Sequence, residues 1–297
     1  MNRLTLCGAL ALLAASPSAQ PRPPTPLPLM TPPVAGDRVL VIAPHPDDET
    51  LCCAGYLQRA VRAGATVAVV WITAGDSFEI DAMVTERTLR PRSAGLEQLG
   101  LRRIAEGQAA ADLLGVPRAN QFLLGFPDRD IAALLQHPQS PALRSRYTGA
   151  SAVPYSDALR PGDPYTGEAL RANLREIIDR FAPTIVLAPS LLDRHPDHSS
   201  SGALAQELLG AGHPGAQLYF WIVHAGLHWP APHGLHRNRP LSPPHRAAAL
   251  AWQQLPLDAA QQTGKLTALH AHHTQMEVMS LFLHAFVRTN EIYAPAP

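Results

Sequence analysis

The chain has 297 residues, enough for one large α/β domain with a substantial core. Its composition, 46% apolar and 16% charged, excludes an intrinsically disordered protein. Basic and acidic residues both number 24, and this zero formal net charge argues against a nucleic-acid partner, which usually requires a basic face.

The amino-terminal segment has the composition of an export signal. Residues 1–19 contain an early arginine, the apolar run "LTLCGALALLAA" and small residues suited to cleavage. The run is too short to span a bilayer, and a buried amino-terminal helix is the alternative. Residues 20–36 are rich in proline and predict an extended, unpacked linker. We therefore expect a folded domain over residues 37–297 in an exported protein, periplasmic or extracellular.

Apolar runs and helical periodicity alternate along the rest of the chain. Continuous apolar runs predict buried strands at 38–43, 66–73, 184–189 and within 216–226, with a shorter strand and a turn inside 120–130. Helical spacing is present at 48–64, 93–115, 166–181, in the segment that ends near 209, and over most of 257–287. This alternation predicts a three-layer α/β sandwich with a mostly parallel central sheet.

Three further segments carry local predictions. Residues 73–91 are polar and predict an irregular loop, and residues 131–166, rich in Pro, Gly, Ser and Tyr, predict a surface excursion that walls a substrate cleft. The adjacent Cys52 and Cys53 are expected to stay unbridged, because a disulfide between neighbours is strained.

Two short polar motifs each stand between a buried strand and a helix. They are "APHPDDE" at 43–49 and "DRHPDH" at 193–198. Parallel sheets place functional groups beyond the carboxyl ends of their strands, so both loops are expected on the same side of the sheet.

The residue types in these loops suit a catalytic divalent metal. Imidazole and carboxylate are zinc ligands, and three protein ligands with one open position are typical of a catalytic zinc site. His45 and Asp48 are three residues apart, as are His195 and His198. One of the adjacent acids Asp47 and Asp48 can bind the metal while the other accepts a proton. Helix capping by either aspartate is the alternative for a single loop.

With these two motifs, the sequence resembles the LmbE/PIG-L family of metal-dependent de-N-acetylases. The intact segments are A-P-H-P-D-D-E and H-P-D-H, and weaker similarity covers "TAGD", "FLLGFPDRD" and "KLTALHAHHTQ" over about residues 37–293. The resemblance implies a Rossmann-like α/β sandwich and the metal ligands His45, Asp48 and His198. It implies zinc as the cofactor, with iron(II) as the alternative.

The resemblance also implies the remaining site residues. Asp47 is the expected general base, and His195, oriented by Asp197, stabilises the oxyanion and protonates the leaving amine. Arg103 is the expected assisting arginine, with the adjacent Arg102 as the alternative. Asp128 is expected to contact substrate, and the late family segment brings His272 and His273 to the cleft.

The function implied is removal of an N-acetyl group from an N-acetylglucosamine unit of a glycan, glycolipid or glycoside. One alternative is deacylation of a longer N-acyl chain on a secreted metabolite or antibiotic-like glycoside, with "LYFWIVHAGLHWP" (218–230) as a source of apolar lining. A non-catalytic glycan- or metal-binding protein is the other. The irregularly spaced histidines are expected mostly at the surface: His213, His224, His228, His233 and His236. The chain has no GxSxG elbow, no phosphate-binding glycine loop and no GxGxxG after its first strand.

Overall fold

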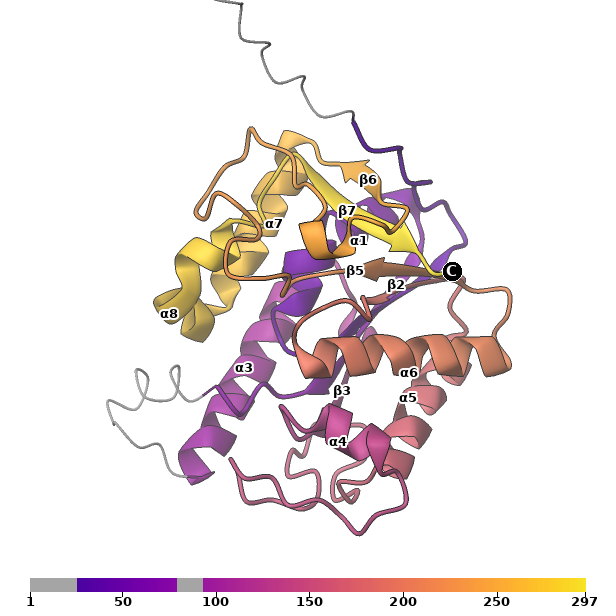
Figure 1. Cartoon of the computed structure of the whole chain (residues 1–297), viewed down its shortest axis with the longest axis vertical. Coiled ribbons are helices and arrows are strands. Elements are labelled where there is room, and N and C mark those ends of the chain that lie inside the picture. Colours follow the sequence, from indigo (N-terminus) through magenta and orange to yellow (C-terminus); the bar gives the residue numbers. More distant parts are fainter. Residues whose placement is uncertain (1–25, 79–92) are drawn as a thin grey trace, which may run out of the picture.

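A seven-stranded sheet in the order β3-β2-β1-β4-β5-β7-β6 organises the chain in the computed structural model, which describes residues 26–78 and 93–297 (Figure 1). The parallel strands are β1 (Arg38–Ala43), β2 (Thr66–Thr73), β3 (Gln121–Phe126), β4 (Ile185–Pro189) and β5 (Gln217–Trp221). At one edge, β7 (Asn290–Pro295) and β6 (Gln253–Pro256) pair antiparallel. The predicted mostly parallel sheet is confirmed.

Helices cover both faces of this sheet and complete the predicted three layers. One group, whose members contact one another, contains α1 (Asp48–Ala63), α3 (Ser93–Leu113) and α7 (Ala259–Ala271). The second group contains α4 (Ile131–Gln136), α5 (Gly167–Phe181) and α6 (Pro196–Gly212), and Figure 1 shows it apart from the first. The helix α8 (His273–His284) follows α7, and short 3₁₀ turns occupy Arg118–Asn120 and His245–Ala247.

The central strands explain the apolar runs of the sequence. In β1, the side chains from Val39 to Ala43 are fully buried, because the strand lies between β2 and β4 and is covered on both faces. The predicted ends of two helices are also present. Thr166 caps α5 by accepting a hydrogen bond from the Ala169 amide at 3.2 Å, and Gly64 ends α1 with φ 81°.

The proline-rich linker packs at its carboxyl end, so its prediction as an unpacked segment is wrong there. The Met30 amide donates to the Gln254 carbonyl at 2.9 Å, and the Gln254 amide donates to Pro28 at 2.8 Å. Met30 is buried, because its apolar side chain covers the edge of the sheet at β6. The predicted export signal lies outside the described residues, as do residues 79–91 of the predicted 73–91 loop.

Two other local predictions are corrected. The 131–166 segment is not only a surface excursion, since Tyr155 and Tyr165 are buried and the Tyr155 hydroxyl donates to Asp76 in the loop after β2. Its buried aromatic residues belong to the same hydrophobic core as β3. Cys52 and Cys53 form a disulfide, contrary to the prediction. Their side chains are adjacent and buried on α1, which places the two sulfur atoms together.

The strands β6 and β7 were not predicted from the sequence. A residue of β7, Glu291, takes part in a buried ion pair. The Lys265 ammonium on α7 lies 2.7 Å from Glu291 Oε1, with both side chains 1% exposed. Glu291 also accepts from the Gly55 and Tyr56 amides of α1 at 2.8 and 2.9 Å. This network joins α1, α7 and β7. Among the described residues, no helix is both long and apolar enough to cross a bilayer.

Replacement of Lys265 by methionine should lower the free energy of unfolding by about 3 kcal/mol, because Glu291 would then be a buried charge without its partner. Urea denaturation followed by circular dichroism measures this change. Arg118→Met is the control, since its pair with Asp112 is exposed and worth about 1 kcal/mol or less. Equal effects of both substitutions would contradict a structural role for the buried pair.

Candidate metal centre and active site

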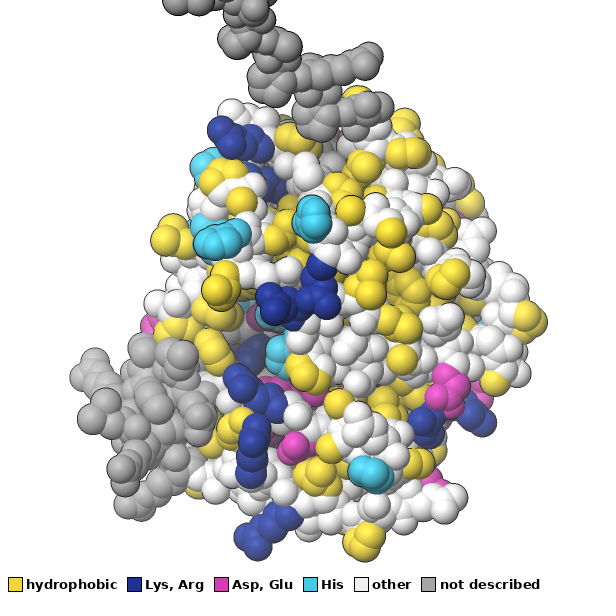
Figure 2. Space-filling model, in the orientation of Figure 1, with side chains coloured by type: hydrophobic (Ala, Val, Ile, Leu, Met, Phe, Trp, Pro, Cys, Tyr) yellow, Lys and Arg dark blue, Asp and Glu magenta, His cyan; other side chains and the backbone are white. Residues whose placement is uncertain are grey.

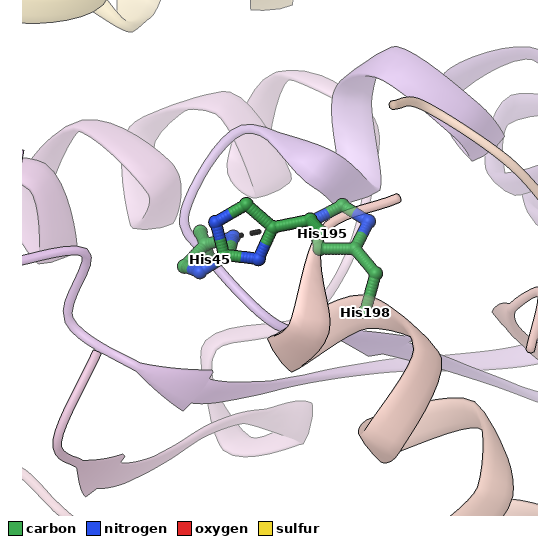
Figure 3. A group of neighbouring side chains, drawn as sticks. All are labelled: His45, His195 and His198. Carbon is green, nitrogen blue, oxygen red and sulfur yellow. Dashed lines mark hydrogen bonds between the residues drawn. The ribbon is translucent and has the colours of Figure 1, made fainter. Parts of the chain in front are cut away.

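Two loops meet where the strand order of the sheet reverses. The chain goes outward from β1 to β2 and β3 on one side, and from β4 to β5 on the other. The crevice between β1 and β4 is therefore the switch point at which α/β sheets place their sites. The loop after β1 supplies His45, and the start of α6, after β4, supplies His195 and His198 (Figure 3). The two motifs face one another as predicted.

Three of these side chains present ligand atoms at nearly equal separations. His45 Nδ1, Asp48 Oδ2 and His198 Nε2 lie 3.3 Å from one another in all three pairs. Atoms bound to zinc at ~2.0–2.1 Å in a tetrahedron lie about 3.3 Å apart, so these residues fit three corners of such a site. His45 and Asp48 also line a pocket that could admit water or substrate beside them. The donors and their spacing therefore fit a catalytic zinc ion.

Neighbouring histidines offer further ligand atoms. His195 forms a compact group with His45 and His198, and His224 forms another with Asp48 and His198. The His224 ring lies 4.7 Å from the His198 ring. The prediction of a mostly surface location is thus wrong for His224, which lines the pocket. In the sequence, this location was indicated only by the position of His224 shortly after β5, at the end of the strands where the site lies.

Two carboxylates hold the outer nitrogens of the ligand histidines. Asp128 Oδ1 lies 3.1 Å from His45 Nε2, and Asp193 Oδ2 lies 3.2 Å from His198 Nδ1. Asp193 also accepts hydrogen bonds from the amides of His195, Val223 and His224 at 2.9 to 3.0 Å. Such partners orient metal ligands and set their tautomer. Asp193, which opens the second motif, was not among the predicted site residues. Asp128 lines the pocket, so its predicted contact with substrate stays a prediction beside its contact with His45.

Asp47 stands at the helix start without capping it. Its side chain makes no capping hydrogen bond, and its backbone has φ 137°, which few non-glycine residues adopt. Its Oδ2 accepts a hydrogen bond from Gln275, and the Arg103 guanidinium lies 3.6 Å away. Burial and the adjacent charge of Asp48 raise the pKa of Asp47 to about 7, although Arg103 opposes this. These features suit a general base and not a helix cap.

Arg103 is the arginine that faces this site, whereas Arg102 is exposed. Its guanidinium donates to the carbonyls of Gly75 at 2.7 Å and Pro46 at 3.0 Å, so it fixes the backbone beside Asp47. Gly75 has φ 67°, and a Cβ there would lie 2.3 Å from the guanidinium. The glycine of "TAGD" is therefore required for Arg103 to reach the loop.

The orientation of His195 differs from the expectation. Its Nδ1 accepts from the backbone amide of Asp197 at 3.3 Å, whereas the Asp197 carboxylate accepts from the Arg129 and Ile131 amides and lies 3.5 Å from His45 Nε2. The backbone, not the carboxylate of Asp197, thus holds the ring. Because Nδ1 accepts, the neutral ring carries its proton on Nε2. Burial and the charges of His45 and His198 lower the pKa of His195 to about 2.

The late segment contributes a different residue from the two predicted. His272 is fully buried behind the site, with Nε2 3.1 Å from Glu49 Oε1, and His273 is exposed. Neither lines the pocket in the part of the chain that the structure describes. Gln275 reaches the site instead, donating to Pro46 and Asp47. The helix turn at the start of α8 directs the glutamine inward.

The pocket has a polar floor and an apolar wall. The floor holds His45, Asp47, Asp48, Arg103, Asp128 and His195, and the wall is formed by Leu51, Phe78, Val223, Met279 and Phe282. Phe220 and Trp221 are buried in the core, so the 218–230 segment contributes only Val223, His224 and their neighbours to this region.

The fold and this site together define a Rossmann-like α/β protein with a candidate metal centre at the switch point of its sheet. A family model described as "PIG-L: GlcNAc-PI de-N-acetylase" matches residues 40–209. The chain belongs to this PIG-L (LmbE) family of de-N-acetylases.

Named relatives agree with this membership. The chain is 30% identical to the 1D-myo-inositol 2-acetamido-2-deoxy-alpha-D-glucopyranoside deacetylase of Nakamurella multipartita, covering 88% of this chain and 86% of that one. The fold is similar to A40926 pseudoaglycone deacetylase Dbv21, with a TM-score of 0.57, 21% identity and 87% and 96% coverage. It is also similar to N,N'-diacetylchitobiose deacetylase from Pyrococcus horikoshii, with a TM-score of 0.52, 20% identity and 87% and 83% coverage. The Rossmann-like α/β fold is thereby confirmed.

Proposed function

We propose that this chain is an exported, zinc-dependent hydrolase that removes the N-acetyl group from an N-acetylglucosamine unit of a glycan, glycolipid or glycoside. The observation that carries the proposal is the equal 3.3 Å spacing of His45 Nδ1, Asp48 Oδ2 and His198 Nε2 beside the buried Asp47. The relative from Nakamurella multipartita, named for an N-acetylated glucosamine-inositol substrate, supports the sugar class.

The metal would be held by His45, Asp48 and His198. When bound, a zinc ion supplies a Lewis acid for the amide carbonyl and lowers the pKa of water toward ~7. Iron(II) takes the same nitrogen and carboxylate donors and is the alternative ion. Asp128 and Asp193 keep the two imidazoles in the tautomers that present Nδ1 of His45 and Nε2 of His198 to the centre.

Asp47 is placed to move the proton. Gln275 occupies its Oδ2, which leaves Oδ1 to accept a proton from the attacking water. Asp47 then returns this proton to the nitrogen of the leaving amine. Arg103 keeps Asp47 in position through the Pro46 carbonyl.

His195 is placed to stabilise the oxyanion. Its ring is neutral, with the proton on Nε2, so it donates a hydrogen bond to the oxygen of the tetrahedral intermediate. Return of the proton to the amine is assigned to Asp47, the group that takes it from water.

Acetate release from a panel of N-acetylated sugars tests this function. The protein should be prepared with one defined metal, and we expect stoichiometric release of acetate and free amine from at least one N-acetylglucosamine derivative. Removal of the metal by a chelator should abolish release, and zinc should restore it. Release that survives complete removal of the metal would contradict the proposal.

Deacylation of longer N-acyl chains is the second candidate function. The apolar wall of Leu51, Met279 and Phe282 beside the catalytic groups favours it, because an acyl chain would be buried there. A series of N-acyl glucosamines from two to ten carbons separates the two functions. A kcat/KM that rises with chain length would select the long-chain activity, and one that falls beyond acetyl would select N-acetyl substrates.

Export is proposed from the leader sequence of residues 1–19 alone. Amino-terminal sequencing of the protein recovered from the extracytoplasmic fraction tests it. Recovery of the intact leader in the cytoplasm would contradict it.

Asp193→Asn should lower metal affinity by about 10–100-fold, because His198 loses the carboxylate that orients it. Competition with a chromogenic chelator measures this affinity. Asp179→Asn is the matched control, since it removes the carboxylate of an exposed His–Asp pair with His213. Equal metal affinity in both variants would refute the role of Asp193.

A further inference from the structure

A second hollow adjoins the catalytic pocket and is lined by three arginines. They are Arg129, Arg146 and Arg194, and the hollow shares Arg129, His195 and His224 with the catalytic pocket. Figure 2 shows basic side chains in dark blue along the central hollow of this face, with histidine and acidic side chains visible between them. The arginines thus adjoin the reacting centre.

The backbones of two of these arginines are held by the catalytic framework. The Arg129 amide donates to Asp197 Oδ2 at 2.6 Å, and the residue adopts φ 66° in the turn that brings Asp128 to His45. The Arg194 amide donates to the His224 carbonyl at 2.7 Å. The backbone positions of Arg129 and Arg194, from which their side chains extend, are therefore fixed relative to the metal ligands.

Tyr147 links the third arginine to the first. The Arg146 guanidinium donates to the Tyr147 hydroxyl at 2.8 Å and lies 4.8 Å from the centre of its ring. The Arg129 guanidinium lies 5.9 Å from the same ring. Cation–π contacts of this kind restrict the two side chains and keep both charges at the hollow.

These charges have no acidic partner in the described part of the chain. No carboxylate there lies within 4.0 Å of the guanidinium groups of Arg129, Arg146 or Arg194, although Asp197 accepts from the Arg129 backbone amide and the charge of Arg146 acts on the nearby Asp130. Asp128 and Asp197 instead face His45. Other exposed arginines do form pairs, such as Arg118 with Asp112 and Arg160 with Glu176. In a chain of zero net charge, the hollow is therefore a local basic site.

We propose that this hollow is an anionic subsite, which binds a phosphate or carboxylate group attached to the sugar on the side away from the N-acetyl group. The inference rests on the proposed function and narrows its substrates to acidic derivatives of N-acetylglucosamine. Guanidinium groups present paired N–H donors that match the oxygens of phosphate and carboxylate. An acidic group held there would fix the sugar while its amide lies between Asp47 and His195.

The test compares kcat/KM for three derivatives: the neutral methyl glycoside, the 1-phosphate and a glycoside whose aglycone carries a carboxylate. We expect an acidic derivative to exceed the methyl glycoside by about tenfold or more, as charged hydrogen bonds imply. The advantage should shrink as ionic strength rises. The acidic derivative with the larger increase in kcat/KM over the methyl glycoside shows whether the hollow prefers phosphate or carboxylate.

Arg146→Gln and Arg194→Gln should each remove most of this advantage and leave the methyl glycoside unaffected. Arg144→Gln is the matched control, because Arg144 is an exposed neighbour that donates to Gly149 and does not line the hollow. Equal kcat/KM for acidic and neutral derivatives, or an advantage that persists in both variants, would overturn the subsite.

A calorimetric arm separates failure of the subsite from failure of the proposed function. Inorganic phosphate and citrate are titrated into the metal-loaded wild type and the Arg146→Gln variant. Binding that the variant loses supports the subsite even if no N-acetylated sugar is hydrolysed. Absence of binding to the wild type, or equal binding to the variant, overturns it.

Discussion

Replacement of Asp47 by asparagine should lower kcat by about 10²–10⁴-fold, the usual contribution of a general base. Asparagine keeps the size of the side chain and an oxygen for Gln275, but it cannot take the proton from water. It also tolerates the positive φ of this position better than most residues. Stopped assays of acetate release give kcat, and elemental analysis gives the metal content.

The metal content distinguishes a lost base from a lost metal. We expect the Asp47→Asn protein to keep its ion, because Asp47 is not one of the three groups at 3.3 Å spacing. Asp157→Asn serves as the control, since Asp157 is exposed and, within residues 26–78 and 93–297, its carboxylate hydrogen-bonds only with Ser156. Turnover near the wild-type rate in the metal-loaded Asp47 variant would refute the proton transfer assigned to it.

His198→Gln should remove both the metal and the activity. The substitution deletes one of three ligands, and loss of metal-based charge stabilisation, worth several kcal/mol, corresponds to a fall in kcat/KM of about 10³-fold. Metal per chain, measured by elemental analysis after dialysis, should fall well below that of the wild type. His45→Gln should behave alike because its nitrogen occupies an equivalent corner.

The exposed His228 provides the control for this experiment. His228→Gln should keep full metal content and activity, because the residue does not line the pocket. Circular dichroism of the His198 variant tests whether it folds, since His198 is fully buried. A folded His198→Gln protein with wild-type metal content and turnover would exclude the proposed centre.

Local patterns were sufficient for the central strands and the two motifs. The run "RVLVIA" is apolar from Val39 onward because β1 is covered on both faces, and such a run can be recognised without knowing which strands pair with it. His45, Asp48 and His198 were also available from spacing and resemblance, since each stands in the loop after a strand or in the first turn of the helix that follows. The edge strand β6, "QQLP", is too short and polar to show such a pattern.

Pairings between distant segments were decided only by the tertiary structure. Gln275 reaches Asp47 across 228 positions of sequence, and Lys265 reaches Glu291 because α7 packs on α1, which in turn contacts β7. The sequence determined which residues carry the chemistry and which segments form parallel strands, since both depend on local residue types and on the spacing of apolar residues. The tertiary packing decided three other features: which carboxylate lies beside which histidine, the inward position of His224, and the group of arginines beside the site. These contacts depend on how whole helices and loops lie on the sheet.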